Sequence, residues 1–385
     1  MSKYTRTATT GEAGLWRERS PLLQRVDIEL TERCNNSCRH CYINRPAADR
    51  EARRGELSTE EIETFLGEAA ELGALTVRFT GGEPLLRADF DRVYVTARRA
   101  GLQVHLTTNA CLVTPALADL FARMPPRAPI QVSVYGMSEP SYESVSGVPG
   151  AFARFRRGLD LLLERGLPVA LTGTALPQTK PEAPQLESWA GGLVSGEKPV
   201  WVTLLYLRAR RDDEAKNELI RSLRLDPEEA VAFLATRSED YLGDLRDFCR
   251  RFMAPPGTAL FDCGAGKAVC LGAYGELQAC LALHAPQTSY DWRSGTLREA
   301  MEDFFPEVRE RRASDPEYLK RCARCFLSGL CEQCPAWSWM ENGALDRPVE
   351  YLCRVAHAQA RALGLLREGE RSWEIEEWKE RLTWM

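Results

Sequence analysis

Three cysteines near the amino terminus are spaced to bind an iron–sulfur cluster. In the segment TERCNNSCRHCY, three residues separate Cys34 from Cys38 and two separate Cys38 from Cys41. Thiolates at this spacing can hold three irons of a 4Fe-4S cluster and leave the fourth iron open to a substrate. The alternative is a zinc site completed by His40. It is disfavoured because His40 adjoins Cys41, and a closed zinc site needs four convergent ligands.

The elements around these cysteines follow the rhythm of a parallel α/β barrel. From Val26 to about Tyr206, short β-rich runs alternate with helical patterns. Six consecutive βα units imply right-handed crossovers and a curved sheet, so we expect a partial (β/α)6 barrel of the TIM type. The expected strands are 26–30, 76–80, 103–107, 130–135, 168–173 and 200–206.

The helices between these strands carry recognisable start and stop signals. Ser58 and Glu61 form a capping box that predicts a helix start. Thr114 before Pro115 predicts another, and a third helix is expected over 151–165. The cysteine loop then follows the first strand directly, at the carboxyl end of the barrel, where such barrels keep their chemistry.

A glycine-rich motif follows the second expected strand. In Gly81-Gly82-Glu83-Pro84 the glycines allow close approach of the backbone to a ligand, and the carboxylate of Glu83 can accept a hydrogen bond from an ammonium group. Together with the three spaced cysteines and the aromatic Tyr42 after them, this motif resembles the radical S-adenosylmethionine (SAM) superfamily.

The resemblance implies both a cofactor and a reaction. The open iron would bind the amino and carboxylate groups of SAM, and one electron would cleave SAM to a 5′-deoxyadenosyl radical that abstracts a substrate hydrogen. It also implies SAM contacts after the first three strands and on the fourth, but no general acid or base is identified. The expected SAM contacts are Tyr42, Gly81, Gly82, Glu83, Pro84, Asn109 and Ser133.

A second cysteine group lies in the carboxyl-terminal third. Eight of the thirteen cysteines fall between Cys263 and Cys353. Taken alone, this half also fits two zinc knuckles of the C-x2-C type. The pattern resembles the SPASM module, which binds auxiliary iron–sulfur clusters, with one departure: two residues separate Cys331 from Cys334, where the family pattern usually has three. The full pattern is Cys263, Cys270, Gly275, Cys280, Cys322, Cys325, Cys331, Cys334 and Cys353.

By this resemblance the chain holds three 4Fe-4S clusters, one that binds SAM and two auxiliary clusters with closed ligand sets. Closed clusters suit electron transfer. Whether Cys270 is the fourth ligand of auxiliary cluster I is left open, because some SPASM proteins lack the cysteine that matches it. The implied ligands are Cys263, Cys270, Cys280 and Cys334 for auxiliary cluster I, and Cys322, Cys325, Cys331 and Cys353 for auxiliary cluster II.

The remaining cysteines and histidines are interpreted as structural. Cys111 and Cys249 stand alone and are expected to be small buried residues. His105, His284 and His357 offer no metal-ligand spacing.

We divide the chain into five parts. The charge-rich run 208–218 is interpreted as a solvated surface. The tail is expected to pack on the module through a helix bearing Trp373, Ile375, Trp378 and Leu382. The parts are an amino-terminal extension (1–24), the barrel (25–226), a helical linker (227–257), the SPASM module (258–355) and a helical tail (356–385).

Composition narrows the partners. A net charge of −5 gives no sign of nucleic-acid binding. There is no signal peptide and no apolar run of about 18 residues, so we expect a soluble, cytoplasmic protein without a membrane partner.

Most SPASM proteins resemble enzymes that modify ribosomally made peptides, so a peptide substrate is the leading hypothesis. An external electron donor such as flavodoxin or ferredoxin would supply the electron. Only residues 1–24 precede the barrel, so a leader peptide would need a separate recognition protein or a groove between barrel and module.

Three alternatives stay open. Anaerobic sulfatase maturases place an acidic residue where Leu281 follows Cys280, which counts against that role. The others are an enzyme acting on a small molecule or tetrapyrrole, and a non-enzymatic zinc-binding interaction protein.

Overall fold

The structure is a computed structural model, and the sheet within it confirms the α/β class. It describes residues 23–43, 45–193, 198–207, 213–237, 241–261, 263 and 265–383. Residues 1–22 and 208–212, which belong to the expected extension and charged run, lie outside the described residues. Six parallel strands match the six expected: β1 (Arg25–Thr31), β4 (Thr76–Gly81), β5 (Gln103–Thr108), β6 (Ile130–Val134), β7 (Val169–Thr174) and β8 (Val200–Val202).

The last of these strands is shorter than expected. The sequence predicted a strand over 200–206, but β8 ends at Val202 and the chain continues as an irregular segment over 203–207. Arg224 explains part of the difference, because its side chain donates to the Leu205 carbonyl in place of a neighbouring strand.

The cysteine-rich part extends the same sheet. Strand β9 (Ala268–Leu271) pairs with β1 in parallel, and β10 (Glu276–Gln278) and β11 (Ser289–Asp291) follow antiparallel. The order is β11-β10-β9-β1-β4-β5-β6-β7-β8, so β8 and β11 are opposite edges and the described strands do not close into a barrel. The expected SPASM module therefore shares a backbone hydrogen-bond ladder with the barrel.

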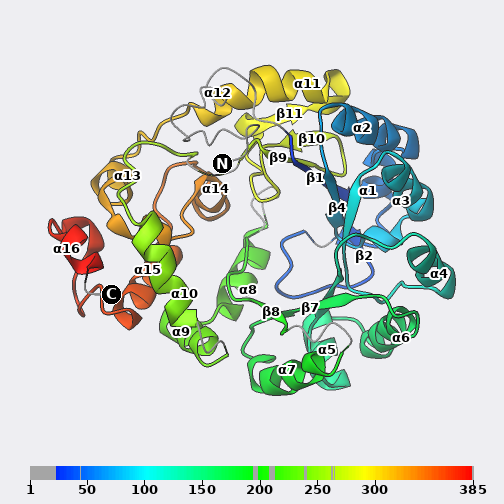
Figure 1. The fold of residues 1–385 in the computed structure, drawn as a ribbon, viewed down its shortest axis with the longest axis horizontal. Coiled ribbons are helices and arrows are strands. Elements are labelled where there is room, and N and C mark those ends of the chain that lie inside the picture. Colours follow the sequence, from blue (N-terminus) through cyan, green and yellow to red (C-terminus); the bar gives the residue numbers. More distant parts are fainter. Residues whose placement is uncertain are drawn as a thin grey trace, which may run out of the picture.

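Helices cover the outer side of this curved sheet (Figure 1). The capping box of Ser58 and Glu61 forms as expected at the start of α2, and Thr114 caps α4. The outer helices are α1 (Arg50–Gly55), α2 (Thr59–Glu71), α3 (Phe90–Arg99), α4 (Pro115–Arg123), α5 (Glu139–Ser146), α6 (Ala151–Leu163) and α7 (Ala183–Gly191).

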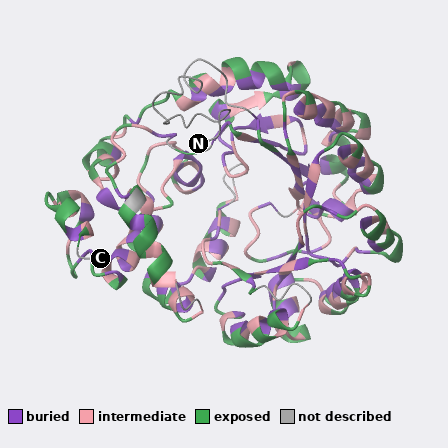
Figure 2. Ribbon diagram, viewed as in Figure 1, coloured by how far each residue is buried: buried purple, intermediate pink, exposed green. Residues whose placement is uncertain are grey.

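Strand alternation separates an apolar layer from a polar interior. On β1, Val26, Ile28 and Leu30 join the buried core (Figure 2). The intervening Asp27 has the opposite orientation and is also buried. It pairs with Arg78 of β4 at 2.7 Å. The inner side of the sheet can therefore receive polar ligands.

The rest of the chain is mostly helical. In the expected tail helix, only α16 is α-helical; Trp373 lies in a separate 3-10 turn, Ser372–Glu374. Trp378 packs on Phe326 with ring centroids 6.0 Å apart, which confirms packing against the module. The helices are α8 (Glu214–Leu223), α9 (Pro227–Ala235), α10 (Tyr241–Phe252), α11 (Leu297–Glu299), α12 (Phe305–Arg309), α13 (Pro316–Lys320), α14 (Pro335–Asn342), α15 (Glu350–Ala362) and α16 (Trp378–Leu382).

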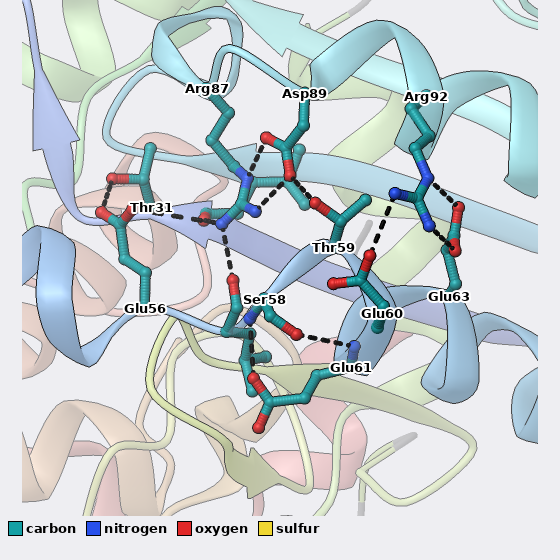
Figure 3. Close-up of polar contacts among 12 residues, drawn as sticks. Thr31, Glu56, Ser58, Thr59, Glu60, Glu61, Glu63, Arg87, Asp89 and Arg92 are labelled. Atoms are coloured by element: carbon teal, nitrogen blue, oxygen red, sulfur yellow. Dashed lines mark hydrogen bonds and ion pairs between the residues drawn. The ribbon is translucent and has the colours of Figure 1, made fainter.

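A buried polar network fixes the loops at the carboxyl ends of β1 and β4 (Figure 3). Thr31 at the end of β1 donates to Glu56, and Arg33 forms two hydrogen bonds to the same carboxylate, at 2.7 and 2.9 Å. Arg87, just after the glycine-rich motif, donates to the Leu57 carbonyl at 2.9 Å. Glu56 and Leu57, which lie just before α2, therefore anchor both loops through their hydrogen bonds.

The substitution Glu56→Ala tests this anchor. It leaves the Arg33 guanidinium buried without its carboxylate, and removing one partner of a buried ion pair costs about 3 to 5 kcal/mol. We expect a loss of this size in the free energy of unfolding, measured by urea denaturation. The control is Glu60→Ala, because Glu60 pairs with Arg92 on the surface and should cost less than about 1 kcal/mol. Equal losses in the two variants contradict the anchor.

Candidate active site

The cysteine loop runs between two short strands, β2 (Arg33–Cys34) and β3 (Arg45–Pro46), which pair in parallel. The amides of Ser37 and Arg39 donate to carbonyls at the end of α5, at 2.8 and 3.0 Å. These bonds hold the loop across the mouth of the barrel.

The three thiols of the loop are brought together. Cys34, Cys38 and Cys41 act on one another electrostatically, and burial raises the pKa of both Cys34 and Cys38. Buried neighbouring thiols of this kind suit a bound cation, which removes the charge repulsion between their thiolates.

Two side chains that sequence reasoning missed contact this loop. Lys216 of α8 donates from Nζ to the carbonyl of Cys38 at 3.0 Å. The hydroxyl of Tyr135, just after β6, hydrogen-bonds the Cys38 side chain, and its ring lies 5.5 Å from the His40 ring. Lys216 belongs to the run that we interpreted as a solvated surface, and that interpretation is wrong for this residue. An isolated lysine in a charged run carries no sequence signal for such a contact.

The paired glycines are required by close backbone packing. The amide of Gly82 donates to the Thr31 carbonyl at 2.7 Å, and a Cβ on Gly82 would lie 2.3 Å from the Arg33 carbonyl oxygen. A Cβ on Gly81 would lie equally close to the Thr31 carbonyl, and its φ is +120°. The glycines therefore let the motif lie against the segment that leads into the cysteine loop.

The carboxylate of Glu83 links two motifs that are distant in sequence. It accepts hydrogen bonds from the Thr108 hydroxyl at 2.7 Å, the Asn109 amide at 2.8 Å and the Leu85 amide at 3.1 Å. Burial raises the pKa of Glu83 to about 7, against the effect of these bonds. The side chain is thus held at the point where β4 and β5 end.

Asn109 connects this point to the cysteines. Its side-chain amide donates to Asn35 at 2.9 Å and lies 3.7 Å from the Cys34 sulfur. Tyr42 lies beside the ring of Tyr206. Ser133 lies on β6, half-buried. The expected SAM contacts thus come from the carboxyl ends of neighbouring strands, and their role stays a prediction.

Six of the eight auxiliary cysteines line a cavity of about 520 Å³. Electrostatic neighbours place seven of the eight auxiliary cysteines in two groups that parallel the ligand sets implied by the resemblance, and leave Cys270 unassigned. The cavity is lined by Cys263, Cys322, Cys325, Cys331, Cys334 and Cys353.

In the first group, Cys334 has Cys280 and Cys263 as neighbours. Cys270 is buried on β9, with Asp27 and Gln278 as its strand partners. Its role as the fourth ligand stays a prediction.

In the second group, Cys331 has Cys325, Cys353 and Cys322 as neighbours. The one-residue departure at Cys331 does not separate it from them.

These arrangements fit iron–sulfur clusters by the chemistry of the donors. Within the described residues no three His, Cys, Asp or Glu side chains converge closely enough to hold a single metal ion. A cubane cluster instead needs thiols spread around a cavity, which is what the auxiliary cysteines provide. The ligand sets stay predictions.

The isolated cysteines are buried, as expected. Cys249 is fully buried and packs with Met253 in a cluster beneath α10. Cys111 is also buried, and its sulfur lies 3.9 Å from the Tyr142 hydroxyl.

A polar groove of about 510 Å³ opens beside the cysteine loop, along β10 and β11. Three carboxylates line it, from Glu32, Glu276 and Asp291, against one arginine, Arg45. Within the described residues, Oε2 of Glu276 is buried without a hydrogen-bond partner. The groove therefore favours donors and positive groups over anions.

Comparison with known proteins defines the class. Residues 28–189 match the family model of the Radical SAM superfamily. The chain carries a radical SAM domain over these residues, as its motifs indicated. The family implies SAM and a 4Fe-4S cluster.

Curated relatives differ in the functions that their names give, and two of them illustrate the range. AdoMet-dependent heme synthase of Methanosarcina barkeri is 27% identical over 327 residues, which cover 82% of this chain and 92% of that protein. PqqA peptide cyclase of Gluconobacter oxydans is 31% identical over 187 residues, which cover 49% of this chain and 51% of that protein.

Similar solved structures include two that were determined with a bound peptide. SuiB of Streptococcus suis bound to the precursor peptide SuiA has a TM-score of 0.63 at 16% identity, covering 85% of this chain and 74% of that chain. The protein anSMEcpe with AdoMet and a peptide has a TM-score of 0.60 at 15% identity, covering 88% and 96%. At these identities the likeness shows the fold, and it confirms the partial-barrel expectation.

None of the helices in the described part of the chain is both long and apolar enough to cross a membrane.

The raised pKa of Glu83 has a consequence for stability. The folded chain keeps a proton on this carboxyl between about pH 4.5, its ordinary pKa, and about 7, so this group's contribution to stability falls as pH rises through that window. Glu83→Gln cannot titrate there. We expect urea unfolding of the cluster-free chain to lose less stability from pH 4.5 to 7 in the variant than in the wild type. Exposed Glu139→Gln is the control, and identical slopes in wild type and Glu83→Gln contradict the assignment.

Removing the Lys216 charge should shift the potential of the SAM cluster. A nearby cation favours the more negative, reduced state, so Lys216→Met should make reduction harder and lower the midpoint potential in an EPR-monitored titration. Lys216→Arg should keep most of the wild-type value. Lys180→Met removes a surface lysine paired with Glu229 and serves as the control. An unchanged potential in Lys216→Met would rule out the charge effect.

Proposed function

We propose that the chain is a radical SAM–SPASM enzyme that modifies a peptide substrate. The proposal is supported by the spaced loop cysteines beside the glycine-rich motif, by the auxiliary cysteines around one cavity, and by the acidic groove that opens next to the loop. When bound and reduced, the SAM cluster supplies the electron that cleaves SAM.

The chain's own residues would orient the reactants. Asn109 and Glu83 hold the ends of β5 and β4 against the loop, so that backbone and side-chain polar groups face one site. Lys216 and Tyr135 hold Cys38 through its carbonyl and its side chain. The polar inner face of the sheet would receive the substrate.

The charge of the groove is the observation that carries the peptide proposal. With three carboxylates against one arginine, the groove repels anions and attracts ammonium, guanidinium and amide donors. A peptide supplies such donors along its backbone and in basic side chains. A tetrapyrrole with several carboxylate side chains would meet like charge there.

A tetrapyrrole substrate is the second candidate. It is supported by the match to heme synthase of Methanosarcina barkeri, which covers 82% of this chain. Arg25 and Arg78, paired with Asp27 at the inner side of the sheet, are the cationic groups that would serve it.

Iron content and SAM cleavage test the cluster assignment. Anaerobic reconstitution should give about twelve irons per chain, as three cubanes, and reductive formation of 5′-deoxyadenosine. Alanine at Cys34, Cys38 and Cys41 together should lower iron to about eight and abolish cleavage. Cys249→Ala removes a cysteine outside all three groups and should change neither. Cleavage retained by the triple variant refutes the assignment.

The substrate class is tested by offering both candidates to the reconstituted enzyme. Small open reading frames beside the gene supply the peptides, and a coproporphyrin iron complex supplies the tetrapyrrole. The peptide proposal expects a mass loss of hydrogen atoms in a peptide by mass spectrometry, weakened by Glu276→Gln. Loss of carbon dioxide from the tetrapyrrole, with no peptide change, overturns it in favour of the second candidate.

A further inference from the structure

Three aromatic rings form a contact chain from the cysteine loop to the first auxiliary thiol group. Tyr42, next to Cys41, lies with its ring centroid 5.4 Å from that of Tyr206, at an interplanar angle of 77°. Tyr206 lies 4.7 Å from Trp337 at 47°. Trp337 belongs to the first turn of α14, and Cys334 is the N-cap residue of that helix.

Tyr206 lies at the centre of this chain. Burial raises the pKa of Tyr206 to about 12, and the nearby Cys334 and Cys280 thiols act in the same direction. The positive charge of Arg78, on the inner side of the sheet, lowers the pKa of the same hydroxyl. Tyr206 is therefore within electrostatic reach of auxiliary cluster I and of the barrel interior.

A buried arginine holds Tyr206 against α14. Arg224 donates from Nε and Nη2 to the carbonyl of Leu205, at 3.2 and 2.6 Å. The same guanidinium pairs with Glu341 of α14 and lies 5.8 Å from the Trp337 ring centroid. Its side chain is only 6% exposed. A planar guanidinium that bonds one element and stacks on another fixes their relative position.

We propose that Tyr206, held between Tyr42 and Trp337, is the bridge for electron transfer between the SAM site and auxiliary cluster I. A substrate radical that forms its new bond must give up one electron, and it releases a proton to the solvent or to a base. The oxidised auxiliary cluster accepts that electron. The π system of Tyr206 couples the two sites without itself being oxidised, and Arg224 is a positioning residue.

The inference rests on the proposed function only for the presence of the clusters, and it holds for either substrate class. The same bridge works in the opposite direction. In the absence of substrate, cleavage of SAM consumes the electron on the SAM cluster, and an electron stored on auxiliary cluster I then crosses to replace it.

The test follows this reverse transfer by freeze-quench EPR. Wild type, Tyr206→Phe and Tyr206→Leu are reduced, freed of reductant and mixed with SAM, and the signal of the reduced auxiliary cluster is followed in time. We expect decay at similar rates in wild type and Tyr206→Phe, and decay slowed several-fold in Tyr206→Leu. Iron content and cluster potentials, measured separately, should be unchanged.

Matched variants make the result specific. Tyr241→Leu removes a partly buried ring of α10 whose hydroxyl accepts from Gln359, away from the chain of three rings, and should decay as the wild type does. Trp337→Leu should slow the decay as Tyr206→Leu does. If Tyr206→Leu binds less iron than the wild type, the decay rate of Trp337→Leu tests the bridge in its place. Arg224→Met should slow decay with unaltered potentials.

Equal decay rates in wild type, Tyr206→Leu and Trp337→Leu overturn the inference, as does a wild type whose auxiliary signal does not decay. A wild type that shows no auxiliary signal and binds about four irons instead overturns the cluster assignment itself. The two failures are therefore distinguishable.

Discussion

The site depends on a backbone contact that only glycine permits. Gly81 and Gly82 lie so close to the carbonyls of Thr31 and Arg33 that a side chain on either would overlap backbone oxygen. This contact sets the glycine-rich motif against the chain entering the cysteine loop. Glu83 then reaches the end of β5, so three successive strand ends meet at one place. The cysteine loop, the glycine-rich motif and the end of β5 therefore lie at one site.

The second organising feature is the continuity of the sheet. Because β9 pairs with β1, the strand that carries Cys270 belongs to the same sheet as the strands that lead to the cysteine loop and the glycine-rich motif. The acidic groove arises at this junction, since its walls come from the end of β1 and from β10 and β11. A module joined by a loose linker would not provide a groove of defined charge.

Contacts between the barrel and the helices beyond it complete the site. Lys216 reaches back from α8 to Cys38, and Arg224 joins the segment after β8 to α14. Each is a long cationic side chain that satisfies a carbonyl otherwise left without a strand neighbour. The contact of Arg224 with the Leu205 carbonyl explains part of the shortness of the last expected strand. Residues that would have continued β8 serve instead as the junction on which Tyr206 is held.

The sequence by itself determined the motifs, the strand order of the barrel and the two cysteine patterns, because covalent spacing and alternation are local properties. For this reason the β-rich run at 26–30 correctly predicted β1, and the capping box of Ser58 and Glu61 correctly predicted the start of α2. Only the tertiary structure decided that Lys216 faces the loop and that Tyr206 lies between Tyr42 and Trp337. These contacts join residues far apart in sequence, and their geometry depends on how the chain packs.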